Sequence, residues 1–178
     1  MLNREMLEER LAALPLFQYE FIRSDELTFT ERIRTVCKQE CPRYGTSWAC
    51  PPAVGTVEEC RARCLAYPDA MMMTTVTEVS DIADIDETLA TRPPHEALTD
   101  EVDALMHECG AEETYVLSTE SCAICDKCAY PGAPCRHPDR MHPCVESHGI
   151  VVTDIAEKYG IDFEAGNIVV WFSLIFYK

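Results

Sequence analysis

A run of cysteines in the second half of the chain has a spacing that suits an iron–sulfur cluster. The run reads C-A-I-C-D-K-C-A-Y-P-G-A-P-C and supplies four thiols: Cys122, Cys125, Cys128 and Cys135. Three thiolates in a C-x2-C-x2-C pattern can each reach a different iron of one cubane, as in bacterial ferredoxins, and the fourth cysteine closes the cage. The prolines and the glycine after Cys128 let the backbone bend around a compact inorganic core. The run therefore predicts a [4Fe–4S] cluster.

A second group of cysteines lies in the segment C-K-Q-E-C-P-R-Y-G-T-S-W-A-C-P-P, at Cys37, Cys41 and Cys50. The aromatic residues Tyr44 and Trp48 between them either shield a cluster from water or belong to the ordinary core. Three thiolates leave one iron of a cubane without a cysteine. We expect a second cluster whose fourth ligand comes from elsewhere or whose fourth iron is open, or a site shared with the first run.

The remaining cysteines have weaker cases as ligands. Cys60 and Cys64 are four residues apart on an expected helix, so they lie close enough to share a metal or to supply a missing ligand. Cys144 follows the main run and is a further possible ligand. Cys109 continues the apolar stripe of another expected helix, and we expect it in the core. A buried free cysteine often acts as a small hydrophobe, and that is the competing interpretation for all of them.

Two other kinds of cysteine site compete with an iron–sulfur cluster. Structural zinc usually takes two separated C-x2-C pairs in tetrahedral geometry, which the dense run after Cys122 matches less well. A disulfide framework fits poorly with 11 cysteines, an odd number, and with a charged N-terminal segment that does not resemble a signal peptide. We therefore expect a reducing cytoplasm and an organism that lives with little oxygen. Two nearby histidines are candidate ligands, donors to cluster sulfurs or plain surface residues: His137 and His142.

The composition indicates one acidic domain. The chain has 178 residues, 47 % of them hydrophobic, which suffices for a single domain over residues 1–178 with its own core. Its formal charge is −16, from 31 acidic and 15 basic residues, and such a chain repels nucleic acid. The same charge suits a basic redox protein as partner. Because no apolar run reaches the roughly 18 residues that span a bilayer, we expect no membrane insertion.

Hydrophobic patterning predicts an α/β domain in which helices cover a mixed sheet of about four strands, with cysteine-rich loops at 37–52 and 122–144 gathered at one end. The three consecutive methionines 71–73 alternate between the faces of a strand, so they fill the core and do not form a copper site. We expect an acidic loop at 81–86, a linker at 91–96 and a helix capped by Thr99. The expected strands are 16–22, 70–79, 113–118 and 167–177, and the expected helices are 3–14, 30–36, 56–65, 99–109 and 145–159.

Both cysteine segments, together with the later E-S-H-G-I, resemble the predicted metal-binding protein family DUF2284, found mainly in anaerobic bacteria and archaea. The resemblance runs from about Cys37 to the last strand. It implies iron–sulfur or other metal binding on cysteines that match Cys37, Cys41, Cys50, Cys122, Cys125, Cys128 and Cys135. Where family members often have Pro-Ser, this chain has Pro143-Cys144, so Cys144 is an additional thiol. The resemblance implies no particular reaction.

Three functions are consistent with these patterns. The ferredoxin-like run and the acidic composition favour electron transfer with a redox partner protein. A three-cysteine cluster with one open iron would instead act as an enzyme, and the third hypothesis is a zinc-bound scaffold or metal-delivery protein. The chain contains no Gly-rich phosphate loop and no hydrolase nucleophile signature, so whether it is an enzyme stays open.

Overall fold

A four-stranded sheet forms the centre of the computed structural model, which describes residues 1–161 and 166–178. Its strands lie in the order β1-β2-β4-β3, and every neighbouring pair is antiparallel. The α+β class and the four strands agree with the sequence prediction, but the sheet is antiparallel throughout and not mixed, because apolar runs identify strands without giving their direction. The strands are β1 (Gln18–Arg23), β2 (Asp69–Glu78), β3 (Thr114–Leu117) and β4 (Ile168–Tyr177).

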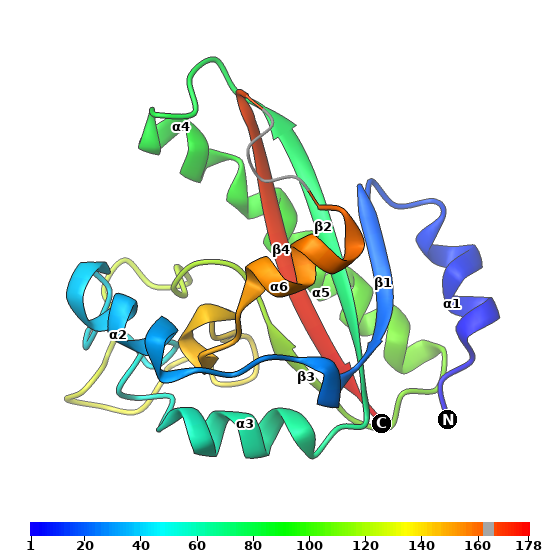
Figure 1. Cartoon of the computed structure of the whole chain (residues 1–178), viewed down its shortest axis with the longest axis horizontal. Coiled ribbons are helices and arrows are strands. Elements are labelled where there is room, and N and C mark those ends of the chain that lie inside the picture. The colour runs from blue at the N-terminus through cyan, green and yellow to red at the C-terminus, as the bar shows by residue number, and fades with distance from the viewer. Residues whose placement is uncertain (162–165) are drawn as a thin grey trace.

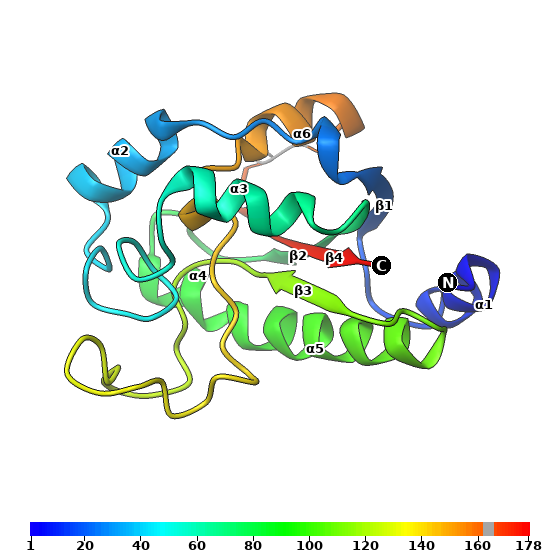
Figure 2. The same cartoon turned by 90° about the horizontal axis from the view of Figure 1, so that it is seen from below.

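Both faces of the sheet are covered, so the molecule has two layers of core. Met71 and Met73 pack on the face covered by α1 (Arg4–Leu11) and α5 (Arg92–Glu108), and Met72 packs on the opposite face. This alternation is the period of a strand, and it confirms that the methionines fill the core. The opposite face is covered by α3 (Val57–Leu65) and α6 (Val152–Tyr159), which precede β2 and β4 (Figures 1 and 2). The helix after β1, α2 (Glu31–Glu40), lies beyond the end of the sheet and has no buried residue.

Three local expectations between β2 and β3 are corrected. The end of the expected acidic loop forms a short helix, α4 (Ile85–Ala90), whose first N–H groups are capped by the side chain of Asp84. The expected linker at 91–96 is the first turn and a half of α5, because proline is tolerated in the first turn of a helix. Thr99 therefore lies inside α5 and is no cap; its hydroxyl donates to the carbonyl of His95 at 2.9 Å.

Two other helices differ from their expected bounds. The short helical turn expected at 30–36 continues to Glu40, so Cys37 lies on α2 and Cys41 is its C-terminal cap. The helix expected at 145–159 is broken at Gly149, whose φ of 76° is left-handed. The break leaves a 3-10 turn (Glu146–His148) before α6, because a left-handed residue cannot continue a right-handed helix.

Two irregular segments emerge at the end of the sheet away from the chain termini (Figure 2). The first cysteine loop, residues 41–56, joins α2 to α3, and the second cysteine loop, residues 118–145, follows β3. A parallel bridge between Ser118 and Cys144 closes the base of the second loop. Within the described residues, no helix combines the length and the apolar character needed to cross a membrane.

Candidate metal centre

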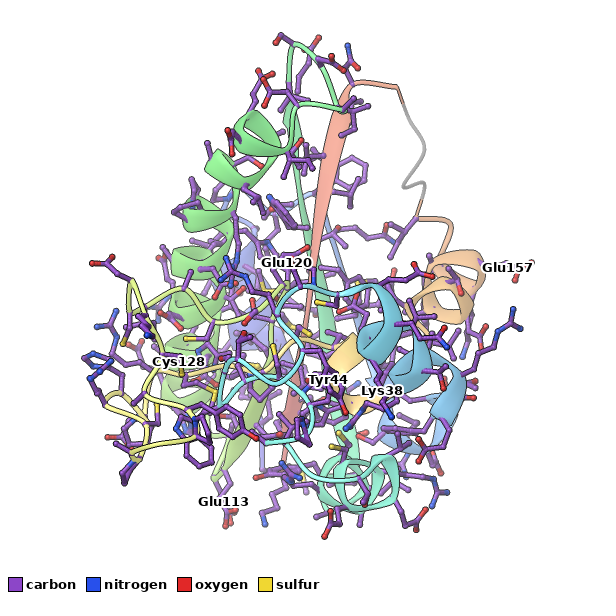
Figure 3. The ribbon with its side chains drawn as sticks, turned by 90° about the vertical axis from the view of Figure 1, so that its left-hand side faces the viewer. Lys38, Tyr44, Glu113, Glu120, Cys128 and Glu157 are labelled. Atoms are coloured by element: carbon purple, nitrogen blue, oxygen red, sulfur yellow. The ribbon has the colours of Figure 1, made fainter. Side chains whose placement is uncertain are left out.

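The four cysteines of the main run line one small cavity of about 20 Å³ inside the second cysteine loop. Trp48 of the first loop and His137 line it as well. Figure 3 looks onto this end of the molecule, with Cys128 on the second loop and Tyr44 on the first. The fold therefore places Cys122, Cys125, Cys128 and Cys135 around a common space, as their spacing suggests.

Backbone groups donate to three of these sulfurs, and the sulfur of Cys122 accepts from the backbone of Ile124. The Cys135 Sγ accepts the N–H of His137 at 3.4 Å. Burial disfavours the thiolate of Cys128, but hydrogen bonds from the backbone of Tyr130 and Trp48 outweigh it, and the pKa of this thiol lies below its ordinary value. Thiolates that accept N–H donors are typical ligands of iron–sulfur clusters, since such bonds tune the charge on sulfur.

The first cysteine loop docks on the second through its tryptophan. The Trp48 Nε1–H donates to the carbonyl of Ala133 at 3.0 Å, and the indole packs edge-on against Tyr130 with 4.9 Å between ring centroids. Trp48 is thus placed to keep water from the cavity. Tyr44 is half-buried and is not among the residues that line the cavity.

The cysteines of the first group lie beside the second loop. Cys50 is buried, and its Sγ lies 3.1 Å from the hydroxyl of Ser121, the residue before Cys122. Cys37 is half-buried on α2, and Cys41 at the end of α2 is exposed. Burial raises the pKa of Cys37, and the neighbouring thiol of Cys41 raises it further, so these sulfurs are close enough to repel one another as thiolates.

A fourth thiol and a carboxylate join this group from the base of the second loop. Burial raises the pKa of Cys144 well above its ordinary value, and the charges of Glu146 and Cys50 add to the effect. The Glu146 side chain lies close enough to act on Cys144 and is itself exposed to solvent. Cys144, which the sequence left open, is therefore a neighbour of Cys50. The sequence analysis did not predict that Glu146 belongs to this group. The only feature of the sequence that indicates it is the position of this carboxylate two residues after the candidate ligand Cys144.

The other cysteines lie outside both groups. Cys64 is fully buried in the core, and burial raises its pKa to about 12. Cys60, on the same face of α3, has its Sγ 3.4 Å from the carbonyl of Val54. Cys109 caps α5 within the core, as expected. His142 faces Asp100, with Nε2 2.8 Å from the carboxylate, so it is engaged away from the sulfurs.

The arrangement of the thiols bears on which metal group fits them. Across residues 1–161 and 166–178, no three His, Cys, Asp or Glu side chains converge closely enough to hold a single metal ion. The chemistry of the donor set, thiolates that accept N–H donors, is that of an iron–sulfur cluster and also that of a structural Cys₄ zinc site.

The fold and the thiols together define a small α+β protein with two neighbouring cysteine-rich loops at one end of its sheet, and cysteine thiols in such numbers are typical of metal-binding proteins. The chain belongs to the family described as predicted metal-binding protein (DUF2284), whose model matches residues 20–177. Comparison with curated proteins finds no match, and comparison with solved structures finds none either.

Proposed function

We propose that the protein carries two [4Fe–4S] clusters and transfers electrons to and from a redox partner. One cluster is held by the main run, and the other by the first group with Cys144 as its fourth ligand. The observation that carries this proposal is the contact between Cys50 and Ser121, because it joins the two thiol groups side by side at one end of the sheet. The proposed ligands are Cys122, Cys125, Cys128 and Cys135, and Cys37, Cys41, Cys50 and Cys144.

Each part of this end has a role in such a carrier. When bound, the clusters supply one-electron chemistry. The protein supplies thiolates, N–H donors such as that of His137, and the indole of Trp48, which limits solvent at one cluster. The exposed Cys41 places the first group near the surface, where a partner can approach. The net charge of −16 attracts a basic partner and speeds its association at low salt.

The test is the metal and sulfide content of protein purified without oxygen, with EPR spectra before and after dithionite. Two cubanes predict about eight iron and eight sulfide per chain and a signal on reduction. About one or two zinc without sulfide would overturn the iron–sulfur assignment and leave the zinc-bound scaffold. Full clusters that no basic electron acceptor can oxidise would instead overturn electron transfer and favour an enzyme.

Single-cysteine variants locate each cluster. Cys125→Ser should lower the iron content by about half, since one of two four-iron clusters loses a ligand. Cys144→Ala should lower it by a similar amount, through the other cluster. Cys109→Ala is the matched control, because this thiol is buried in the core away from both groups, and it should keep the full iron content. Unchanged iron in Cys125→Ser would contradict the assignment of the main run.

A further inference from the structure

A cavity of about 650 Å³ lies between the two cysteine loops and the helices α4 and α5. This volume is in the range of small-molecule sites in proteins. Cys41 lines it on one side and Ser121, the neighbour of Cys50, on the other. A molecule in this cavity therefore touches the residues around the first cysteine group.

The charged residues of the cavity leave two arginines available. Arg92 is engaged by Glu96, with Nε 3.2 Å from the carboxylate, and Asp100 is engaged by His142. Arg43 and Arg140 also line the cavity, one from each cysteine loop, and neither forms an ion pair within the described residues.

Glu120 is the remaining carboxylate of the lining, so the lining as a whole balances three arginines against three carboxylates, and Arg43 and Arg140 are distinguished by forming no ion pair with any of the three. Guanidinium groups of this kind bind carboxylates through paired N–H donors.

The same cavity has an apolar wall. Ile85 is 70 % exposed, Leu89 is 40 % exposed and Ile124 is 36 % exposed, and all three line the cavity. Large apolar side chains exposed together around a hollow mark a surface that a ligand covers, whereas single ones scattered over a surface do not. The wall predicts a hydrocarbon portion in the ligand.

We propose that this cavity binds a small organic carboxylate, with the carboxylate on Arg43 and Arg140 and the hydrocarbon portion against Ile85, Leu89 and Ile124. The ligand then lies beside Cys41, the exposed thiol of the first group. This inference goes beyond electron transfer: it gives the protein a small-molecule site next to the proposed second cluster. The inference is based on the cavity and its arginines, and it does not depend on which metal the thiols bind.

The test is calorimetric titration of the anaerobically purified protein with hexanoate and with hexanamide, its uncharged analogue. We expect hexanoate to bind. Hexanamide should bind at least about tenfold more weakly, since a charge-assisted hydrogen bond contributes roughly 1.5–3 kcal/mol. Arg43→Gln and Arg140→Gln should each weaken hexanoate binding about tenfold. Arg43→Lys should weaken it less, because it keeps the charge and loses only the paired donors.

Arg61→Gln is the control, because Arg61 is an exposed arginine of α3 that does not line the cavity. It should leave binding unchanged. Metal content and circular dichroism, measured for every variant, show that the fold and the metal group are intact. Equal binding of hexanamide, undiminished binding in the Arg43→Gln, Arg140→Gln double variant, or no binding of hexanoate would each overturn the carboxylate site.

The metal analysis keeps this inference distinct from the proposed function. Hexanoate binding by a protein that contains zinc and no sulfide would refute the iron–sulfur proposal and support the cavity. In an iron–sulfur protein, hexanoate should also change the EPR signal of the cluster near Cys41, and this change should survive in Cys125→Ser.

Discussion

The surroundings of the sulfurs distinguish two kinds of cysteine in this chain. Those on the loops line a cavity or contact another loop, and some accept N–H donors, as Cys135 does from His137. Cys64 on α3 and Cys109 at the end of α5 are packed among apolar side chains, and for Cys64 burial raises the pKa to about 12. The Cys64 thiol therefore stays protonated at neutral pH and is inert toward metals and oxidants. Sequence spacing alone does not make this distinction.

A buried histidine adds a pH dependence to folding. His95 is 1 % exposed, and its ring nitrogens lie 2.7 Å from the hydroxyl of Ser173 and 2.9 Å from that of Thr75. Burial lowers its pKa to about 4 from the ordinary 6.5, and the nearby Arg92 lowers it further. Protonation therefore favours the unfolded chain, and the stability that the neutral ring confers is present above pH 6.5 and is lost as the pH falls toward 4.

We predict that His95 accounts for about 2 kcal/mol of the stability lost between pH 7 and pH 5. The measurement is urea unfolding of the wild type and of His95→Gln at both pH values. The variant starts from a lower stability at pH 7, because it loses contacts in the core, but it should lose about 2 kcal/mol less on acidification. His107→Gln, at an exposed histidine near the end of the same helix, should keep the full acid loss. An equal acid loss in His95→Gln would contradict the prediction.

At the scale of elements, the break before α6 sets the position of the first cysteine group. The carbonyl of Gly149 accepts the N–H of Thr30, the N-terminal cap of α2, at 2.8 Å. A bridge between Phe29 and Ile150 continues this contact. It holds α2, which carries Cys37, beside the turn that follows Cys144.

Gly149→Ala is predicted to loosen this junction. A Cβ at position 149 would lie 3.0 Å from the Thr30 carbonyl oxygen and 3.0 Å from both methyl groups of Val57, and the left-handed φ costs roughly a further 1–2 kcal/mol. Gly160→Ala carries the same backbone cost, at φ 69°, but its Cβ meets no atom of the described residues within 4 Å. We expect the Gly149 variant to be the less stable of the two in urea and to lose metal from the first group. Equal stability and metal content in both variants would refute this role for the junction.

The success of sequence reasoning varied by element for physical reasons. The apolar runs placed β2 and β4 within a residue or two, because strands buried on both faces are nearly continuous in hydrophobic residues. The prolines of α5 indicate a linker when only the sequence is considered. They lie in the first turn of the helix, where the backbone N–H groups have no intrahelical acceptor and proline is therefore tolerated. The neighbourhood of Cys144 and Cys50 could not be predicted, because it depends on the bridge from Ser118 to Cys144, a contact across 26 residues.

At the scale of the whole molecule, a two-layered core supports an end with little regular structure. The sheet and its helices have apolar residues buried on both faces, whereas the two cysteine loops are held to each other by few bonds, such as that from Trp48 to Ala133. We expect the order of these loops to depend on a bound metal, since metal binding contributes directly to folding free energy. The core does not share that dependence.

We therefore predict that removing the metal unfolds the loops and spares the sheet. After treatment with a chelator under reducing conditions, hydrogen exchange measured by mass spectrometry should accelerate in residues 41–56 and 118–145, while β2 and β4 stay protected, because stability in such a molecule is lost locally before it is lost globally. The helix α1, distant from both loops in Figure 2, serves as the internal control and should not change. Global loss of protection would mean that the metal is part of the folding core, and the sheet would then be unable to hold the cysteine ligands in place before the metal arrives.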